Sequence, residues 1–192
     1  MDIESGRSEK QSQLLPKNRL LLGVGLAIQI GLSVLVFWFY DALYNRSPAG
    51  CAALVSMSLC ATSQLLVQLF TSRFDLSRLV KFYVWGAQNG IWTRFWTEQL
   101  TNKLEWTITK VLWDQIYGNS MGIFMYISLS GYWEGYNLTL YLQENYWNSL
   151  KASWLVWPIA SLVQFYVVPH RYIALFNTAV NFVWTIVLGL IA

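Results

Sequence analysis

Long apolar segments, separated by short polar ones, make up most of the chain after residue 19. Residues 20–40 contain no charged residue over 21 positions, and residues 50–70 are also free of charge. A helix of about 20 apolar residues crosses the hydrocarbon core of a bilayer, so both segments predict membrane-spanning helices. Further spans are predicted at residues 82–96, 106–131, 152–168 and 173–192.

The basic residues between these segments support an even number of crossings. Six crossings place eight Lys and Arg residues on the N-terminal side and three on the other side, as the positive-inside rule expects. Four full spans with two shallow or paired half-spans fit almost as well. The predicted fold class is therefore all-α, a polytopic transmembrane helix bundle of about four to six membrane helices. It occupies residues 20–192 as a single domain, after a disordered polar tail at residues 1–19.

Composition excludes several classes of protein. Only 12% of the residues are charged and 55% are hydrophobic, whereas about 25% of a soluble domain is charged. The net charge is +3 and no run of basic residues is interleaved with aromatic ones, so no nucleic acid is expected as a partner. The acidic residues of the tail differ from a mitochondrial presequence, and no signal-peptide layout precedes the first apolar segment.

Catalysis, metals and cofactors find little support in the sequence. The single histidine and the two separated cysteines, Cys51 and Cys60, are too few for a usual metal site, so no metal is expected. Nine residues apart on a helix, these cysteines face opposite sides and are not expected to form a disulfide. No nucleophile, base and orienting group stand together, and no phosphate loop or dinucleotide fingerprint occurs. The protein is therefore expected to be no enzyme and to need no cofactor.

Polar residues inside the predicted spans are the candidates for function. Lys110 and Asp114 are four positions apart on one helical face and are expected to pair. Charges in the hydrocarbon are costly and persist only where water or a partner meets them. One interpretation is the lining of a solute path, formed by Lys110, Asp114, Gln115, Gln88, Asn89 and Arg94. The alternative is a buried pair that fixes how the helices pack.

Tryptophan, proline and glycine positions predict local structure. Trp154 and Trp157 are expected at a membrane interface, since an indole has an apolar face and a polar edge. Pro158 is expected to begin a helix and Pro169 to end it. Gly86 and Gly90 form a pair with small-xxx-small spacing, which is compatible with a tight helix crossing or with chance.

The same residues also carry a family signature. The C-terminal part of the signature is W-x-x-W-P, then Gln164-Phe165, Val168-Pro169 and Trp184. The N-terminal part is Trp38, Tyr40, Leu43, Pro48 and Gln64. The central part is Asp75, Arg78, Gly86, Gly90, Trp96 and Leu100, followed by Lys110, Asp114 and Gln115. Over roughly residues 37–187 the chain resembles the Mpv-seventeen/peroxisomal membrane protein family. Cys60-Ala61 replaces the family's usual Gly-Asp, so the chain resembles a divergent member.

The resemblance implies a small integral protein of an organelle membrane. The mitochondrial inner membrane is slightly preferred as the location over the peroxisomal or vacuolar membrane. The implied function is a channel-like or permeability-regulating role for small solutes, and the alternative is a non-conducting membrane organiser that binds partner proteins. The expected partners are the lipid bilayer and small solutes. Whether the protein forms a homo-oligomer is left open by the sequence. The motif residues expected to have structural roles are Trp154, Trp157, Pro158, Phe165, Pro169, Trp184, Gly86 and Gly90.

Overall fold

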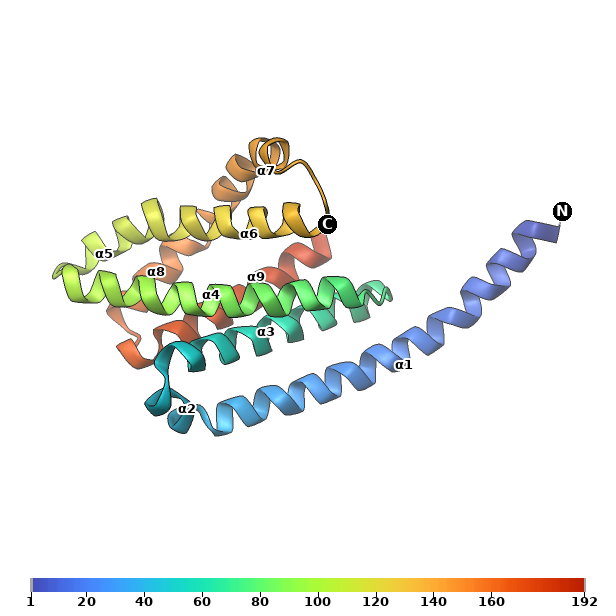
Figure 1. Cartoon of the computed structure of the whole chain (residues 1–192), viewed down its shortest axis with the longest axis horizontal. Coiled ribbons are helices and arrows are strands. Elements are labelled where there is room, and N and C mark those ends of the chain that lie inside the picture. The colour runs from blue at the N-terminus through green and yellow to red at the C-terminus, as the bar shows by residue number, and fades with distance from the viewer. Residues whose placement is uncertain (1, 192) are drawn as a thin grey trace.

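The computed structural model describes the backbone of residues 2–191 and the side chains of residues 19–186. Its regular structure is entirely helical over these residues, which confirms the predicted fold class. The elements are α1 (Asp2–Trp38), α2 (Tyr40–Arg46), α3 (Pro48–Thr71), α4 (Leu76–Lys103), α5 (Thr107–Trp113), η1 (Asp114–Asn119), α6 (Ser120–Trp133), α7 (Leu138–Ser153), α8 (Trp157–Tyr166), η2 (His170–Tyr172) and α9 (Ile173–Ile191). Figure 1 shows α4 between α3 and α6, with α1 diverging from the bundle toward its N-terminus.

Among the residues whose side chains are described, two helices are long and apolar enough to cross a membrane by themselves. They are the part of α1 from Arg19 to Trp38 and the whole of α3. The outer face of α1 carries large apolar side chains in the open, among them Leu20 at 70% and Ile28 at 61% exposure. Such a continuous apolar surface is typical of a helix that faces lipid. The predicted tail, residues 1–19, falls almost wholly among residues whose side chains are not described, and its disorder stays a prediction.

Gly86 and Gly90 allow α4 to lie directly against the backbone of α3. A Cβ atom on Gly86 would stand 2.6 Å from the Cα of Met57, and one on Gly90 would stand 2.9 Å from the Cα of Ala53. Carbon atoms cannot approach so closely, so any side chain at either position would push the helices apart. The predicted tight crossing is therefore confirmed, and α3 is its partner.

Hydroxyl and amide groups connect α1 to this pair of helices. The Gln29 amide donates to the carbonyl of Ser58 at 3.1 Å, and the hydroxyls of Ser33 and Ser58 are 2.6 Å apart. The hydroxyl of Tyr83 on α4 donates to the Gln29 amide oxygen. Polar side chains of this kind satisfy one another between helices in lipid, where no water replaces a lost partner.

The turn between α3 and α4 is closed by one amide side chain. Gln68 donates to the carbonyl of Asp75 and accepts from its backbone N–H, both at 2.9 Å. Asp75 in turn caps α4 by accepting from the N–H of Arg78 at 3.0 Å. Ser72 ends α3 in the left-handed conformation with φ 53°. These contacts hold the two helices antiparallel and thereby fix which face of α4 looks toward the rest of the bundle.

Within residues 152–168, predicted as a span with half-spans left open as the alternative, the structure forms one separate short helix. α7 ends at Ser153, three residues turn, and α8 begins at Trp157 with Pro158 in its first turn. α8 has 10 residues, which rise ~15 Å and cover about half of a bilayer core. The turn before α8 breaks a segment whose apolar composition alone reads as continuous. The predicted roles of Pro158 at a helix start and of Pro169 after a helix end are confirmed.

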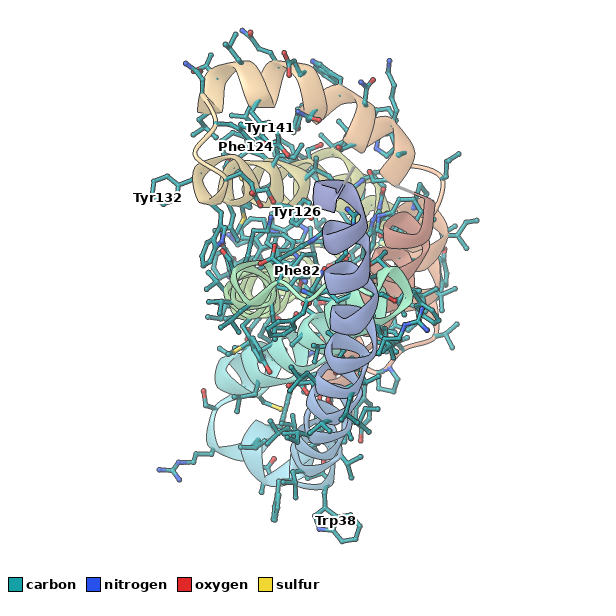
Figure 2. All side chains as sticks on the ribbon, turned by 90° about the vertical axis from the view of Figure 1, so that its right-hand side faces the viewer. Trp38, Phe82, Phe124, Tyr126, Tyr132 and Tyr141 are labelled. Atoms are coloured by element: carbon teal, nitrogen blue, oxygen red, sulfur yellow. The ribbon has the colours of Figure 1, made fainter. Side chains whose placement is uncertain are left out.

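α7 lies on the outside of α6. Tyr141 of α7 and Phe124 of α6 point into the space between the two helices, whereas Tyr132 and Trp38 point away from the molecule (Figure 2). Tyr141 stacks on Tyr136 with ring centroids 5.1 Å apart. Part of the segment between the predicted spans 106–131 and 152–168 is thus a helix that packs against the bundle.

Candidate functional site

A cavity of about 500 Å³ lies inside the bundle, lined by side chains of α3, α4, η1, α6, α7, α8 and α9. Its longest wall is one face of α4, where lining residues recur every three or four positions from Arg78 to Thr97. Nineteen residues of helix rise ~28 Å, close to the ~30 Å thickness of the hydrocarbon core. Arg78 and Asn148 are lining residues that are also exposed, so the cavity reaches the surface of the protein.

Aromatic rings form much of this wall. Trp92 and Trp96 stack in parallel with centroids 5.7 Å apart, and Tyr126 of α6 meets the edge of Trp85 at 5.1 Å. Figure 2 shows Phe82 and Tyr126 facing each other across the space between α4 and α6. The indoles of Trp157 and Trp184 line the cavity from α8 and α9. Rings packed against one another lose few conformations on binding and present a stiff surface to a ligand.

Asp114 connects three elements at the cavity wall. One carboxylate oxygen accepts a hydrogen bond from the indole N–H of Trp96 at 2.9 Å, and the other accepts from the hydroxyl of Ser161 on α8. The predicted pair with Lys110 does not form. The ion pairs among the described side chains are Lys81–Glu134, Arg94–Glu98 and Arg171–Asp41.

The helix changes type at Asp114. Asp114 is the first residue of η1, a π-helical turn inserted between α5 and α6. Its backbone N–H still bonds to the carbonyl of Lys110, so the two residues keep the spacing of a regular α-helix. The Asp114 carboxylate nevertheless bonds to Trp96 and Ser161 and not to Lys110, and the π turn changes the rotation only of the residues that follow it.

Gly118 makes the contact between Trp96 and Asp114 possible. A Cβ atom on Gly118 would stand 2.6 Å from the Asp114 carboxylate oxygen and 2.8 Å from the indole carbon next to the Trp96 nitrogen. Any larger residue would occupy the space through which the hydrogen bond runs. Sequence reasoning did not find this glycine, because its role depends on two side chains from another turn and another helix.

Two amides attach the π turn to α7 and α8. Gln115 donates to the Ser161 hydroxyl at 2.8 Å and to the carbonyl of Trp157 at 3.3 Å. Asn119 donates to the Ser153 hydroxyl at 2.8 Å. The break between α7 and α8 thus lies beside the π turn, and its own backbone closes it with bonds from Leu155 to Ala152 and from Val156 to Ser153.

The structure brings two of the six predicted lining residues to the cavity. Asp114 and Asn89 line it, whereas Lys110, Gln115, Gln88 and Arg94 lie outside its wall. Arg94 instead pairs with Glu98 at 3.4 Å, and one of its nitrogens lies 3.4 Å from Nδ1 of His170. Burial and the neighbouring Arg94 charge lower the pKa of His170. Arg94 therefore belongs to a charged cluster at the end of the bundle that holds α2 and η2.

Several polar lining residues were missed. Asn177, Asn181 and Thr185 recur at every fourth position of α9 and face the cavity together. Asn177 donates to the buried amide oxygen of Gln164, and Asn181 contacts the sulfur of Cys60 at 3.7 Å. Polar residues at this spacing in an apolar segment are a signal that sequence analysis can use.

Comparison with known proteins places this architecture among relatives. A model of the Mpv17 / PMP22 family matches residues 135–189, which include all of α7 and α8 and most of α9. PXMP2/4 family protein 3 of Dictyostelium discoideum is 27% identical over 166 residues, which cover 81% of this chain and 89% of that protein. These matches confirm the resemblance of the chain to the Mpv17 / PMP22 family.

Two fungal relatives extend the comparison. Protein SYM1 of Kluyveromyces lactis is 28% identical over 69% of this chain and 78% of its own length. Protein sym-1 of Neurospora crassa is 29% identical over 65% of this chain and 77% of its own length. No solved structure matches the chain.

The family motif contributes to the cavity and to its surroundings. Trp157 and Trp184 line the cavity, Phe165 is half-buried, and Trp154 is 49% exposed in the turn before α8. Together with the exposed apolar face of α1, the similarity to the Mpv17 / PMP22 family identifies the chain as an integral protein of an organelle membrane.

Proposed function

We infer that the protein provides a path for small solutes across an organelle membrane. The observation that carries this inference is the cavity itself, whose α4 wall extends from Arg78 to Thr97 over ~28 Å. Amide side chains line this cavity from α3, α4, η1, α7 and α9, whereas a dry helix interface needs none of them, since each costs free energy in hydrocarbon unless a partner meets it. Water and a passing solute supply such partners in the cavity.

Localisation is part of the same proposal. The relatives include proteins named PXMP2/4 family and SYM1. We propose the mitochondrial inner membrane as the location, in preference to the peroxisomal or vacuolar membrane. Imaging of a tagged copy at its native expression level, against markers of the three organelles, decides among them. Signal that follows a peroxisomal or vacuolar marker contradicts the mitochondrial assignment.

Cysteine accessibility tests whether the cavity contains water. Asn89→Cys places a thiol on the cavity wall, and Gln88→Cys places one at the neighbouring position outside it. The native thiols Cys51 and Cys60 are 2% and 1% exposed, so the unmodified protein is the control for background labelling. In liposomes, a membrane-impermeant thiol reagent is expected to label Asn89→Cys and not Gln88→Cys.

Equal protection of both thiols contradicts the path. In that case the amides of the bundle interior are structural, and the protein is the non-conducting organiser that binds partner proteins. Labelling of Asn89→Cys combined with solute flux above that of empty liposomes supports the path. The two readouts together separate a water-filled dead end, which labels without flux, from a conducting path.

A further inference from the structure

Most polar side chains of the cavity are neutral amides and hydroxyls. The lining amides come from five different elements and are Gln64, Asn89, Asn119, Asn148, Asn177 and Asn181. Each amide offers two donors and a carbonyl acceptor on one planar group. A solute that presents donors and acceptors side by side, as every hydroxyl does, therefore finds matching partners on several sides of the cavity at once.

Formal charge is scarce along the same wall. Arg78 and Asp114 are the charged residues among the described lining side chains. Arg78 is exposed at the first turn of α4, and each carboxylate oxygen of Asp114 already accepts a hydrogen bond from the protein. An ion that leaves water needs opposite charge or a ring of oriented carbonyl groups, and this cavity offers neither between its two ends.

One lining amide lacks the partner that a polyhydroxylated solute can provide. The side chain of Gln64 is 1% exposed, and its Nε2 has no hydrogen-bond partner within the described part of the protein. A buried donor without an acceptor is unfavourable, so a ligand oxygen at this place would satisfy it. Gln64 lies one helical turn after Cys60, whose sulfur contacts Asn181, so two amides from α3 and α9 meet at this level.

Tryptophan side chains supply the apolar contacts that complement the hydrogen bonds of the amides. Five tryptophans line the cavity, and two of them, Trp92 and Trp96, are stacked as one flat surface with an interplanar angle of 11°. The electron-rich face of an indole packs against the slightly positive C–H groups of a sugar or sugar alcohol, while the hydroxyl groups at the edges remain free for the amides. The volume of about 500 Å³ lies within the range of sites for small organic molecules.

We propose that the cavity selects neutral polyhydroxylated solutes, such as sugar alcohols and monosaccharides, and discriminates against inorganic ions. This proposal rests on the proposed solute path, because it names the class of solute that the path carries. Neutral amides and indole faces recognise the solute, and the low density of charge excludes ions that would have to shed their water.

Flux measurements on reconstituted protein test the selectivity. Sorbitol permeation is followed by light scattering of proteoliposomes, and potassium chloride permeation is followed in the same vesicles with valinomycin present. Sorbitol is expected to enter faster than into empty liposomes, whereas chloride entry stays at the level of empty liposomes. Asn89→Leu and Asn181→Leu are each expected to lower sorbitol flux about tenfold, the factor that corresponds to ~1.4 kcal/mol.

Gln88→Leu is the matched control, because it makes a similar change in polarity one residue away from the wall and should leave sorbitol flux unchanged. Asn148→Leu, at an exposed position of the wall, repeats the test in a variant whose folding depends little on that side chain. Gel filtration and thermal unfolding in detergent establish that each compared variant is folded.

Each outcome decides one of the two proposals. If neither sorbitol nor chloride enters, the solute path fails. If chloride enters as fast as sorbitol, the path stands and the selectivity proposal is overturned. If sorbitol enters but the three asparagine variants match Gln88→Leu, the amides do not recognise the solute and the selectivity proposal is likewise overturned.

Discussion

The indole N–H of Trp96 donates a hydrogen bond to the carboxylate of Asp114 at 2.9 Å, which joins α4 to the π turn between α5 and α6. The second carboxylate oxygen accepts from Ser161, so the same side chain also holds α8. A carboxylate inside a membrane bundle is unfavourable unless donors surround it. Here the donors are neutral side chains of two neighbouring helices, and a lysine one turn away has no part in it.

Removal of the Asp114 carboxylate is expected to destabilise the bundle. Asp114→Ala leaves the Trp96 indole and the Ser161 hydroxyl without their acceptor, at a cost of about 1–3 kcal/mol for each buried group left unpaired. Asp114→Asn retains an acceptor for Trp96 and a donor for Ser161, so most of the stability is kept. Thermal unfolding in detergent should rank the proteins as unmodified, Asp114→Asn and then Asp114→Ala. An equal loss for both variants shows that the charge, and not hydrogen-bond geometry, stabilises this site.

Gly90→Ala is expected to weaken the contact between α3 and α4. The added methyl group would meet the backbone of Ala52 and Ala53, which cannot move aside as a side chain end can. Overpacking of this kind costs about 1–3 kcal/mol. Gly31→Ala on α1 is the control, since no atom lies within 4 Å of a Cβ there. Unfolding temperatures in the same detergent should fall for Gly90→Ala and not for Gly31→Ala, and equal temperatures for the two variants contradict the close approach.

The lowered pKa of His170 predicts a loss of stability in mild acid. Burial and the Arg94 charge keep the imidazole neutral in the folded protein, with Lys110 acting in the same direction and Glu98 opposing them. As the pH falls below ~6.5, the unfolded chain binds a proton at this histidine that the folded protein does not, so unfolding becomes easier. His170→Gln removes this contribution.

The unfolding temperature of the unmodified protein should therefore drop more between pH 7.5 and 5.5 than that of His170→Gln. Both proteins are measured in the same detergent, and only the difference between their two drops is attributed to His170. Identical drops contradict the assignment.

Glu134→Gln is expected to destabilise the end of the bundle where α4 begins. Lys81 is 7% exposed and pairs with Glu134 at 2.7 Å. Loss of the carboxylate charge leaves the buried ammonium group without compensation, at a cost of about 1–3 kcal/mol. Glu105→Gln removes an exposed carboxylate that takes part in none of the described ion pairs and is expected to be neutral. Thermal unfolding of both variants checks the expectation, and an equal effect of both contradicts a role for the pair.

The sequence predicts the long helices well and the short ones poorly, for a physical reason. An uncharged segment such as residues 50–70 reveals its length through composition alone, and α3 extends it by only a few residues. The break at residues 154–156 and the π turn at Asp114 leave no mark in hydropathy, because the side chains that bond across them come together only in the folded bundle. Glycine spacing did predict a close approach, since Gly86 and Gly90 act through the absence of their own side chains.

Only part of the candidate site could be predicted from the sequence, for a similar reason. Asn89 and Asp114 stand out as polar residues in apolar surroundings, and both line the cavity. Gln88 and Gln115 stand out equally but lie outside its wall, because polarity alone does not give the rotation of a helix. Asn177 and Asn181 were overlooked, although their spacing of four defines one face of α9 without any structure.

The π turn at Asp114–Asn119 limits how the length of this chain can vary. Deletion of one residue within it would let the backbone return to regular α-helical bonding. Because the π turn holds one residue more than an α-helical turn over nearly the same rotation, this deletion would leave α5 and α6 on their present faces. Deletion of a residue from the regular helix between the π turn and Tyr126 would instead turn everything after it by about 100°, and Asp114 and Tyr126 could no longer face the same space. The segment between α6 and α7 has no such constraint, so relatives with longer or shorter chains are expected to gain or lose residues at positions 134–137, or one residue within the π turn, and to keep the count from Ser120 to Trp133.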